Sequence, residues 1–384
     1  MFEALWLLLP VAAASGWISA RRSGSRFDIE PPSEYYQGIN YLLNRQEDKA
    51  IDVFLRQAEV DDDAAETHLA LGSLFRQRGD VERAIRMHKD LIGRPGLRKR
   101  TRDESRLELA RDYFASGLLD WAEEALQELI NDGVLVEAAY EQLIGIYERE
   151  KEWQQALAAA ETCQRQTDLD LAARAVHFHC ELHEQALRSG DTDRAADHLD
   201  RAEALGPTVA RVWCLRAEAA RRAGDMRGAV QHYEMVVSLD EGMVPEVAEH
   251  LLSALTATGD ERQIRAYLNK LRHQPNTYTM VSTAAGLIAK FENTRSARQF
   301  FKDQLLQRPS LPGLTHWARA EMESGSSETR AQVGVIVEML ERLMAKRPTH
   351  ACRVCSYRGH QLYWLCPGCH SWDSIRPIMG DDGE

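Results

Sequence analysis

A short sequence pattern returns along the chain at a nearly constant period, and this period limits the possible folds more than any other feature. The pattern is Gly-Asp, three residues and then alanine, as in RGDVERAIRMH (78–88), SGDTDRAADHL (189–199) and AGDMRGAVQHY (223–233). Successive alanines at this position are separated by 34, 38, 34, 39 and 34 residues: Ala50, Ala84, Ala122, Ala156, Ala195 and Ala229. Such a period predicts stacked units of two antiparallel helices, because a single unit cannot bury its apolar face alone.

Each unit also has its own internal pattern. Gly-Asp predicts a left-handed helix end followed by an N-cap. A second position lies in the first helix, twelve residues before each alanine, and a small residue there lets the two backbones approach. The residues at this position are Gly38, Gly72, Ala110, Ile144, His183 and Ala217, of which four are small. Larger side chains should fill the gaps on either side: Phe75, Tyr113, Tyr147 and Tyr233.

The pattern resembles the tetratricopeptide repeat. The resemblance implies an all-α superhelix, and residues 31–348 have room for about nine units. Beyond residue 240 the units become less regular, with Ile264 and Ala297 at the alanine position. We expect the extra residues in the two longer spacings to form loops between units.

Four cysteines are concentrated near the carboxyl end in two Cys-x-x-Cys pairs, CRVC (352–355) and CPGC (366–369). Their thiolates can surround one tetrahedral ion, so the predicted metal ligands are Cys352, Cys355, Cys366 and Cys369. A region this short cannot build a sufficient core, and the ion must hold it together. We expect zinc rather than iron, although four thiolates accept either metal.

The two pairs resemble a rubredoxin-type or zinc-ribbon knuckle, placed at 349–384. Rubredoxin knuckles usually carry glycine after the second cysteine, whereas this chain has Ser356 and His370. Between the pairs, SYRGHQLYWL is predicted to form a short hairpin with its turn near residues 358–360. The aromatic residues exceed what so small a core needs, so we expect the domain to pack against the repeats: Tyr363, Trp364 and Trp372.

The amino-terminal segment is apolar. Residues 4–20 contain no charged side chain and would span roughly 25 Å as a helix, close to the ~30 Å hydrocarbon core of a bilayer. The basic residues Arg21, Arg22 and Arg26 follow this run instead of preceding it. The positive-inside rule therefore predicts a single-pass transmembrane helix (1–20), a linker (21–30) and a cytoplasmic carboxyl-terminal part. The alternatives are a cleaved signal peptide and a buried soluble helix.

Charge and motifs limit the possible functions. Acidic residues outnumber basic ones, 59 to 47, and a net charge of −12 argues against a general nucleic-acid binder. No phosphate-binding loop, G-x-G-x-x-G, H-E-x-x-H or G-x-S-x-G motif occurs. The sequence therefore offers no catalytic or organic-cofactor residues, and we predict that the chain is not an enzyme.

Two weaker clusters have ordinary interpretations. His177, His179, Cys180 and His183 share one predicted helix, where packing or solvent exposure is a simpler explanation than metal binding. The run from Arg94 to Arg106 holds six basic residues and coincides with the first long spacing. It is interpreted as a solvated loop, with contact to anionic lipid or an acidic partner as the alternative.

The whole chain resembles the lipopolysaccharide assembly protein B family of Gram-negative bacteria. The segments that carry this resemblance include YYQGINYLLNRQEDKAIDVFL (35–55), HLALGSLFRQRGDVERAIRMH (68–88), HFHCEL (177–182) and LYWLCPGCHSWDSIRPI (362–378). The resemblance implies an inner-membrane adaptor that regulates lipopolysaccharide biosynthesis. Its implied role is to promote degradation of the lipid A committed-step deacetylase by the membrane-bound ATP-dependent zinc protease.

The same resemblance implies a third partner, an inner-membrane regulator that senses lipopolysaccharide, and the chain could also form a homodimer. Two other functions stay open at this point. One is a scaffold that assembles lipopolysaccharide enzymes, and the other is a rubredoxin-type electron carrier that uses the repeats as a docking arm.

Overall fold

The computed structural model describes residues 33–44, 46, 49–53, 65–273, 277–324 and 326–380. The predicted membrane helix (1–20) and linker (21–30) lie outside these residues. Within the described ranges, no helix combines the length and the hydropathy needed to cross a bilayer.

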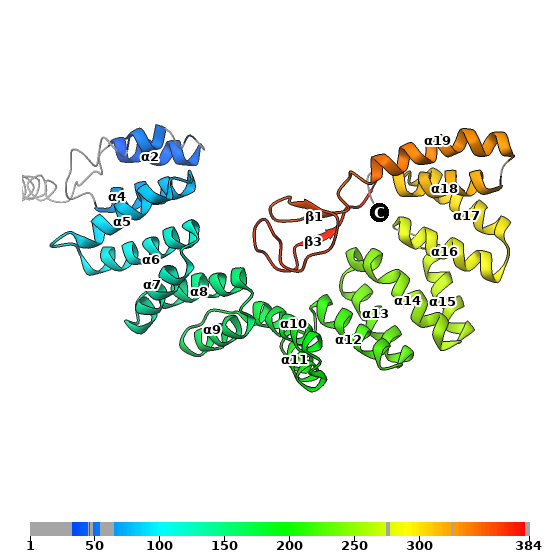
Figure 1. Ribbon diagram of the computed structural model, residues 1–384, viewed down its shortest axis with the longest axis horizontal. Helices are drawn as coiled ribbons and strands as arrows, with labels where there is room; N and C mark the ends of the chain where they lie inside the picture. Colours follow the sequence, from blue (N-terminus) through cyan, green and yellow to red (C-terminus); the bar gives the residue numbers. More distant parts are fainter. Residues whose placement is uncertain are drawn as a thin grey trace, which may run out of the picture. The chain divides into compact units, whose positions relative to one another are not determined.

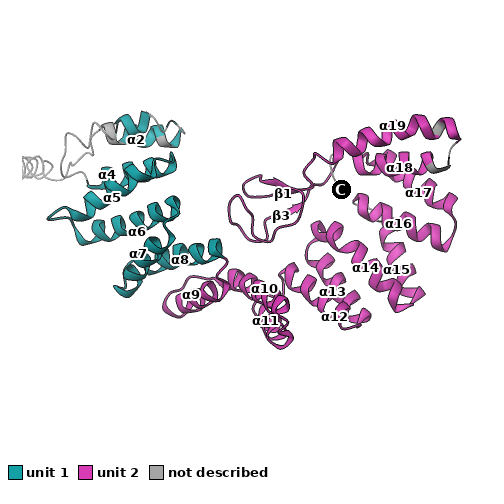
Figure 2. Ribbon diagram, viewed as in Figure 1, with its two compact units in different colours: residues 1–150 teal, residues 151–384 magenta. Residues whose placement is uncertain are grey.

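The chain divides into two compact units, residues 1–150 and 151–384 (Figure 2). The helices of the first unit are α2 (Ser33–Leu43), α4 (Ala65–Gln77), α5 (Val81–Gly93), α6 (Lys99–Ser116), α7 (Leu119–Asn131) and α8 (Val136–Glu150). Those at the start of the second unit are α9 (Trp153–Gln166), α10 (Ala172–Ser189), α11 (Thr192–Leu205), α12 (Ala210–Arg222), α13 (Met226–Leu239) and the 3-10 helix η2 (Glu241–Met243). They continue with α14 (Val244–Thr258), α15 (Glu261–His273), α16 (Tyr278–Phe291), α17 (Thr294–Gln307), α18 (Leu311–Ser324) and α19 (Ser327–Met344).

Within each unit, consecutive helices form antiparallel hairpins such as α4/α5 and α12/α13 (Figure 1), which confirms the mostly helical repeat fold. The predicted contact positions are buried as expected. The six alanines of the repeat are at most 1 % exposed: Ala50, Ala84, Ala122, Ala156, Ala195 and Ala229. The larger side chains predicted to fill the gaps are also buried: Phe75, Tyr113, Tyr147 and Tyr233.

The Gly-Asp turns have the predicted conformation. Four of their glycines have φ between 69° and 83°: Gly79, Gly190, Gly224 and Gly259. The Asp191 side chain accepts a hydrogen bond from the backbone N–H three residues later at 3.0 Å, and Asp225 does the same at 2.9 Å. Asp80 instead forms an ion pair with Arg83 at 3.3 Å. The aspartate thus caps the following helix in some repeats only.

One close helix contact in the first unit depends on Gly72. A side chain at this position would overlap the imidazole ring of His88. His88 is buried, and its Nδ1 lies 2.6 Å from Asp112 Oδ2, while Arg76 donates to the other Asp112 oxygen at 2.7 Å. The missing side chain of Gly72 therefore provides the space for a buried polar network that connects α4, α5 and α6.

The prediction of loops in the two longer spacings was wrong. The extra residues lengthen the first helix of the unit, because α6 and α10 each contain 18 residues, compared with 15 in α8 and 13 in α12. An additional helical turn uses about 3.6 residues and leaves the helix-facing stripe in place. A repeat can therefore absorb four or five extra residues without a new loop.

The carboxyl-terminal part of the second unit is a three-stranded antiparallel sheet with the order β2-β1-β3, formed by β1 (His350–Cys352), β2 (Arg358–Gly359) and β3 (Ile375–Pro377). The predicted hairpin turn at 358–360 was wrong, because residues 358 and 359 pair with β1. The chain reverses instead at each Cys-x-x-Cys pair, and an isolated bridge joins Leu365 to Trp372 across the second reversal. The knuckles themselves supply the tight turns.

Candidate metal centre

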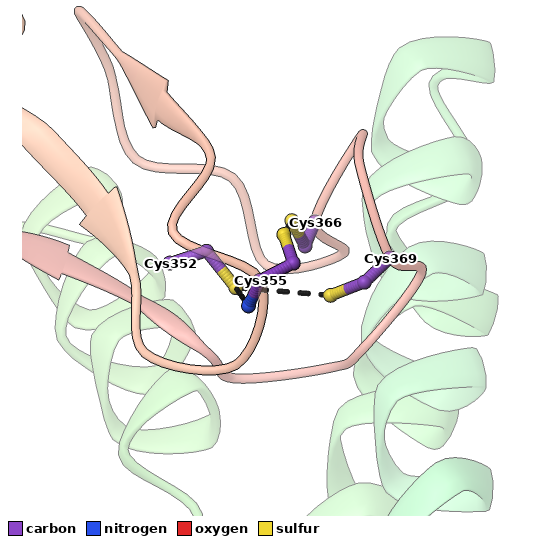
Figure 3. A group of neighbouring side chains, drawn as sticks. All are labelled: Cys352, Cys355, Cys366 and Cys369. Carbon is purple, nitrogen blue, oxygen red and sulfur yellow. Dashed lines mark hydrogen bonds between the residues drawn. The ribbon is translucent and has the colours of Figure 1, made fainter. Parts of the chain in front are cut away.

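The two Cys-x-x-Cys turns bring the four sulfurs together. Figure 3 shows the cysteine side chains converging from the two turns, and all four Sγ atoms lie within 4.8 Å of one another. The Val354 N–H approaches Cys352 Sγ at 3.4 Å, and the Gly368 N–H approaches Cys366 Sγ at the same distance. Backbone N–H groups therefore point at the sulfurs in both turns and would stabilise negative charge on them.

The sulfur spacing fits a single ion. Cys352 Sγ lies 3.7 Å from Cys369 Sγ, and Cys355 Sγ lies 3.7 Å from Cys366 Sγ. A tetrahedral ion with metal–sulfur bonds of about 2.3 Å would hold its ligands about 3.8 Å apart. The fold thus brings the four predicted ligand side chains together at a spacing that suits one tetrahedral ion.

Hydrogen bonding favours the thiolate form at two of these positions. Burial opposes ionisation of Cys352, but the Ser374 hydroxyl and nearby backbone N–H groups lower the pKa of its thiol to about 6. The Ser371 hydroxyl lowers the pKa of the Cys369 thiol. Since the thiolate is the form that binds a metal, both serines support ligation.

The residues that replace the usual knuckle glycines keep the knuckle geometry. Ser356 has φ of 61° and His370 has φ of 55°, so both adopt the left-handed conformation. The Ser356 N–H donates to the Cys352 carbonyl at 3.1 Å, and the His370 N–H donates to the Cys366 carbonyl at 2.9 Å. Both turns therefore close normally, at the cost of placing a side chain where glycine is favoured.

Trp372 anchors the small domain to the helices of the second unit. Its ring stacks on the His177 ring with centroids 4.7 Å apart and an interplanar angle of 8°. Trp153 and Phe178 meet it edge-on, with centroids at 5.9 and 6.0 Å. The tryptophan that follows the second cysteine pair is thus held by aromatic side chains of α9 and α10.

A buried arginine lies at the same contact. Arg211 of α12 is 1 % exposed, and its guanidinium lies 5.5 Å from the Trp364 ring centroid and 5.9 Å from that of Trp372. Its Nη2 donates to Glu181 at 2.8 Å and to Glu184 at 3.1 Å. The two carboxylates and the two ring faces offset part of the cost of burying this charge, while Nε and Nη1 are buried without a hydrogen-bond partner.

His177 is neutral in this environment. Burial, followed by the positive charges of Arg211 and Arg376, lowers the pKa of His177 to about 3. Protonation would place a cation beside two arginines in a buried contact. The stacked pair of His177 and Trp372 therefore depends on a neutral imidazole.

Two polar pairs hold the strands to the helices at the other side of the domain. Arg376 Nε donates at 2.6 Å to Asp240, which directly precedes η2, and Arg376 Nη2 donates to Asp373 at 2.8 Å. His350 Nε2 lies 2.9 Å from Glu246 Oε1 on α14. These pairs connect β3 to the residue between α13 and η2, and β1 to α14, both more than one hundred residues earlier in the chain. Figure 1 shows the strands alongside these helices.

The predicted packing of the domain is confirmed for Trp364, which packs against the core of the second unit, and for Trp372. It is not confirmed for Tyr363, which packs against the domain's own core of Cys352, Cys366 and Ile375. The sequence pattern did not predict the partners of the small domain in the repeat region: His177, Arg211, Asp240 and Glu246. His177 begins the segment HFHCEL (177–182), but nothing in its spacing indicates that it meets a tryptophan near the carboxyl end.

The histidine cluster on α10 is an ordinary packing cluster, as expected. His179 Nδ1 lies 3.1 Å from His198 Nδ1, and His183 Nδ1 lies 2.7 Å from the Ala195 carbonyl oxygen. His179 and His183 therefore have separate partners on α11. Cys180 is fully buried, and burial raises the pKa of its thiol to about 12, so it is not a reactive thiol.

The basic run from Arg94 to Arg106 is only partly a loop. Residues 99–106 belong to α6, and Arg106 forms ion pairs with Glu128 of α7 at 3.0 Å and with Asp132, the residue after α7, at 2.8 Å. Arg100 pairs with Glu104 at 2.8 Å. Part of this charge therefore serves contacts within the first unit.

Comparison with known proteins agrees with this architecture. Sequence profiles described as tetratricopeptide repeat match residues 67–101 and 184–243, and one described as rubredoxin metal binding domain matches residues 350–377. Lipopolysaccharide assembly protein B of Escherichia coli (strain K12) is 32% identical over 390 residues, which cover 100% of both chains. The chain belongs to the lipopolysaccharide assembly protein B family. The lipopolysaccharide assembly protein B of Haemophilus influenzae is 28% identical and also covers both chains completely.

Members of the lipopolysaccharide assembly protein B family are named as assembly proteins, which agrees with the prediction that this chain is not an enzyme. Among solved structures, the match to a crystal structure of MamA covers 44% of this chain and 94% of the MamA chain, with 20% identity and a TM-score of 0.35. The carboxyl-terminal part of a repeat protein from Cytophaga hutchinsonii covers 71% of this chain and 94% of its own, with 13% identity and a TM-score of 0.41. Both scores are too low to bear on function.

Proposed function

We propose that Cys352, Cys355, Cys366 and Cys369 bind one zinc ion. Four sulfurs at tetrahedral spacing form a closed site, which is typical of structural zinc. The domain has a very small buried core, formed by Cys352, Cys366 and Ile375. The ion would cross-link the two knuckles and so hold Trp372 and Arg376 in position against the helices.

Metal analysis of the full-length protein tests this proposal. We expect one zinc per chain and no visible absorbance. A serine at any of the four cluster cysteines should lower the zinc content, and Cys163→Ser is the matched control that should not. Cys163 lies on α9 outside the cluster, and the new hydroxyl can keep the contact with Thr167 Oγ1, which is at 3.4 Å. Stoichiometric iron with visible absorbance would contradict the zinc assignment and favour an electron carrier.

We propose that the chain is an inner-membrane adaptor that regulates lipopolysaccharide biosynthesis. It would bring the lipid A deacetylase to the membrane-bound ATP-dependent protease for degradation, and it would respond to an inner-membrane regulator that senses lipopolysaccharide. The observation that carries the proposal is the combination of stacked helical hairpins with a small four-cysteine domain fixed to them, in a family named for lipopolysaccharide assembly. Repeats of this kind act as binding surfaces without any chemistry of their own.

The first helices of successive units offer a surface for such a client. A cavity of about 360 Å³ lies between α10 and α12, lined among others by His183, Glu184, Arg188, Glu218 and Arg222. The lining carries charges of both signs, in the pairs Arg188–Glu184 and Arg222–Glu218, so the cavity suits a polar protein segment better than an acyl chain.

The proposed amino-terminal anchor (1–20) would tether the adaptor to the membrane that holds the protease. Tethering client and protease to one membrane raises their effective concentration without any new contact. The bulk of the chain would then lie on the cytoplasmic side of the inner membrane.

The deacetylase half-life in living cells tests the adaptor proposal. The double substitution Cys352→Ser and Cys355→Ser should lengthen that half-life severalfold, because loss of the ion releases the small domain from α9, α10 and α12. Cys163→Ser should leave it unchanged. If the deacetylase half-life does not change when the whole protein is depleted, the scaffold alternative is favoured and the adaptor proposal fails.

A further inference from the structure

A cavity of about 650 Å³ lies where α17, α18 and the residues after α19 meet, and it is here called the carboxyl-terminal cavity. Figure 1 shows these three helices as neighbours at the end of the helical part of the second unit. The volume falls within the range of about 300–1,000 Å³ that is typical of small-molecule sites. Six of the nine lining side chains are apolar: Leu305, Leu306, Pro309, Leu311, Leu314 and Trp317.

The apolar wall of this cavity is fixed by close packing at the start of α18. A Cβ atom on Gly313 would come within 2.8 Å of Leu305 Cδ1, so the Leu305 side chain lies directly against the α18 backbone. Ser310 Oγ accepts a hydrogen bond from the Gly313 N–H at 3.2 Å, which holds the turn between α17 and α18. Leu306 and Leu314 are 71 % and 44 % exposed, so the wall also presents apolar surface that the chain itself leaves uncovered. The cavity is therefore preformed and has apolar surface available for a ligand.

The charged residues that line the cavity are both basic. They are Lys302 of α17 and Arg347 after α19, and no described acidic side chain lines the cavity. Asp303, next to Lys302, accepts a hydrogen bond within α17 at 2.8 Å and is not part of the lining. Residues 302–311 and 344–348 together contain four basic residues and one acidic residue, although the whole chain has a net charge of −12. This local excess of positive charge favours a ligand with an anionic end.

The polar groups of the lining distinguish an alkyl chain from a peptide. A peptide segment would bring backbone N–H groups into the cavity, where the lining side chains offer one oxygen acceptor, Ser310 Oγ, which already accepts from α18. Burial of an amide without a hydrogen bond is unfavourable, whereas an alkyl chain gains from each methylene that leaves water. A neutral or cationic head group would leave Lys302 and Arg347 without an opposite charge from the ligand.

We propose that the carboxyl-terminal cavity binds a single-chain anionic amphiphile. The alkyl chain lies against the apolar side chains of α17 and α18, and the anionic head group, a carboxylate or a phosphate, lies at Lys302 and Arg347. The cavity shares no lining residue with the metal centre or with the cavity between α10 and α12. The proposal therefore does not depend on the adaptor function.

Photo-crosslinking of the full-length chain in phosphatidylcholine nanodiscs tests the proposal. The probe is dodecanoate with a diazirine in its alkyl chain, and peptide mass spectrometry locates the adducts. We expect adducts in residues 302–317, with competition by unlabelled dodecanoate and by dodecyl phosphate but not by dodecanol. Equal competition by dodecanol, or the absence of adducts in residues 302–317, would overturn the proposal. If nanodiscs that contain phosphatidylglycerol suppress the adduct as strongly as dodecanoate does, the occupant is a bilayer lipid and the proposal is also wrong.

Charge reversal tests the position of the head group. Lys302→Glu should lower the adduct yield about tenfold, because it replaces an attraction by a repulsion, whereas Lys302→Arg should keep most of the yield. The matched control is Lys270→Glu, which makes the same charge change at an exposed lysine of α15 outside the cavity and should leave the yield unchanged. A full yield with Lys302→Glu, or an equal loss with Lys270→Glu, would contradict a head group held at Lys302.

Amide hydrogen exchange gives a readout that does not depend on the photochemistry. Unlabelled dodecanoate should slow exchange in residues 302–317 of the unsubstituted chain, and it should have little effect there in the Lys302→Glu variant. Exchange in α12 and α13 serves as the internal control for the folding of each variant. Unchanged exchange in residues 302–317 at saturating dodecanoate would refute binding at this cavity.

Discussion

Trp372 should contribute most of the contact that fixes the small domain to the helices. Substitution by alanine removes one stacked and two edge-on ring contacts, with His177, Trp153 and Phe178. Each ring pair contributes about 0.5–1.5 kcal/mol beyond burial, and truncation of a well-packed tryptophan costs about 3–5 kcal/mol. Because Trp372 is only half-buried, we take the lower end, about 3 kcal/mol, which is roughly a hundredfold in the ratio of docked to released domain.

Amide hydrogen exchange of the full-length, zinc-loaded chain measures this ratio. Trp372→Ala should increase exchange in residues 172–182 of α10 and in residues 240–246, where the domain is held. The matched control is Trp121→Ala, because Trp121 is 56 % exposed on α7 and meets Tyr113 edge-on at 5.6 Å, far along the chain from the contact. Unchanged exchange in both segments of the Trp372 variant would refute the reasoning.

A double-mutant cycle separates the stacked pair from the rest. His177→Ala combined with Trp372→Ala should cost less than the sum of the two single changes, by about 1 kcal/mol. Strict additivity would mean that the two rings do not interact in solution.

Three further predictions concern single positions. The pKa of His177 is lowered to about 3, below its unfolded value of about 6.5. As the pH decreases from 6.5 towards 3, the undocked form takes up the proton first, so the stability of the docked domain falls. Lowering the pH from 7 to 5.5 should therefore cost about 1 kcal/mol of docking, measured by hydrogen exchange, and His177→Gln should remove that part of the pH dependence. Ser356→Gly and His370→Gly should each raise the stability of the zinc-loaded domain by up to about 1 kcal/mol in thermal unfolding, since both positions have φ near 60°. A decrease would show that contacts of these side chains stabilise the domain by more than the backbone strain destabilises it. Gly72→Ala should lower the unfolding free energy of the chain by about 1–3 kcal/mol, because its methyl group overlaps the His88 ring, and an unchanged denaturant midpoint would contradict the packing described.

Much of the fold could be predicted because it depends on short sequence separations. The turn glycines, the buried alanines and the convergent cysteines follow from relations within one hairpin or one knuckle, where spacing fixes geometry. The predicted loops in the two longer spacings were wrong because four or five extra residues can extend a helix or a loop, and composition does not distinguish the two. The predicted turn near Gly359 was wrong because each Cys-x-x-Cys pair already reverses the chain.

The metal centre and its contact with the helices depend on different kinds of information. The sequence alone determined that the chain repeats a two-helix unit and ends in four cysteines spaced for one ion, since both features are encoded by residues a few positions apart. Only the tertiary structure decided where the small domain sits. Arg376 meets Asp240 across 136 residues, His350 meets Glu246 across 104, and Trp372 meets His177. Contacts at such separations depend on how many helices stack between the partners and on the rotation from each helix to the next. A local sequence pattern does not determine this cumulative geometry.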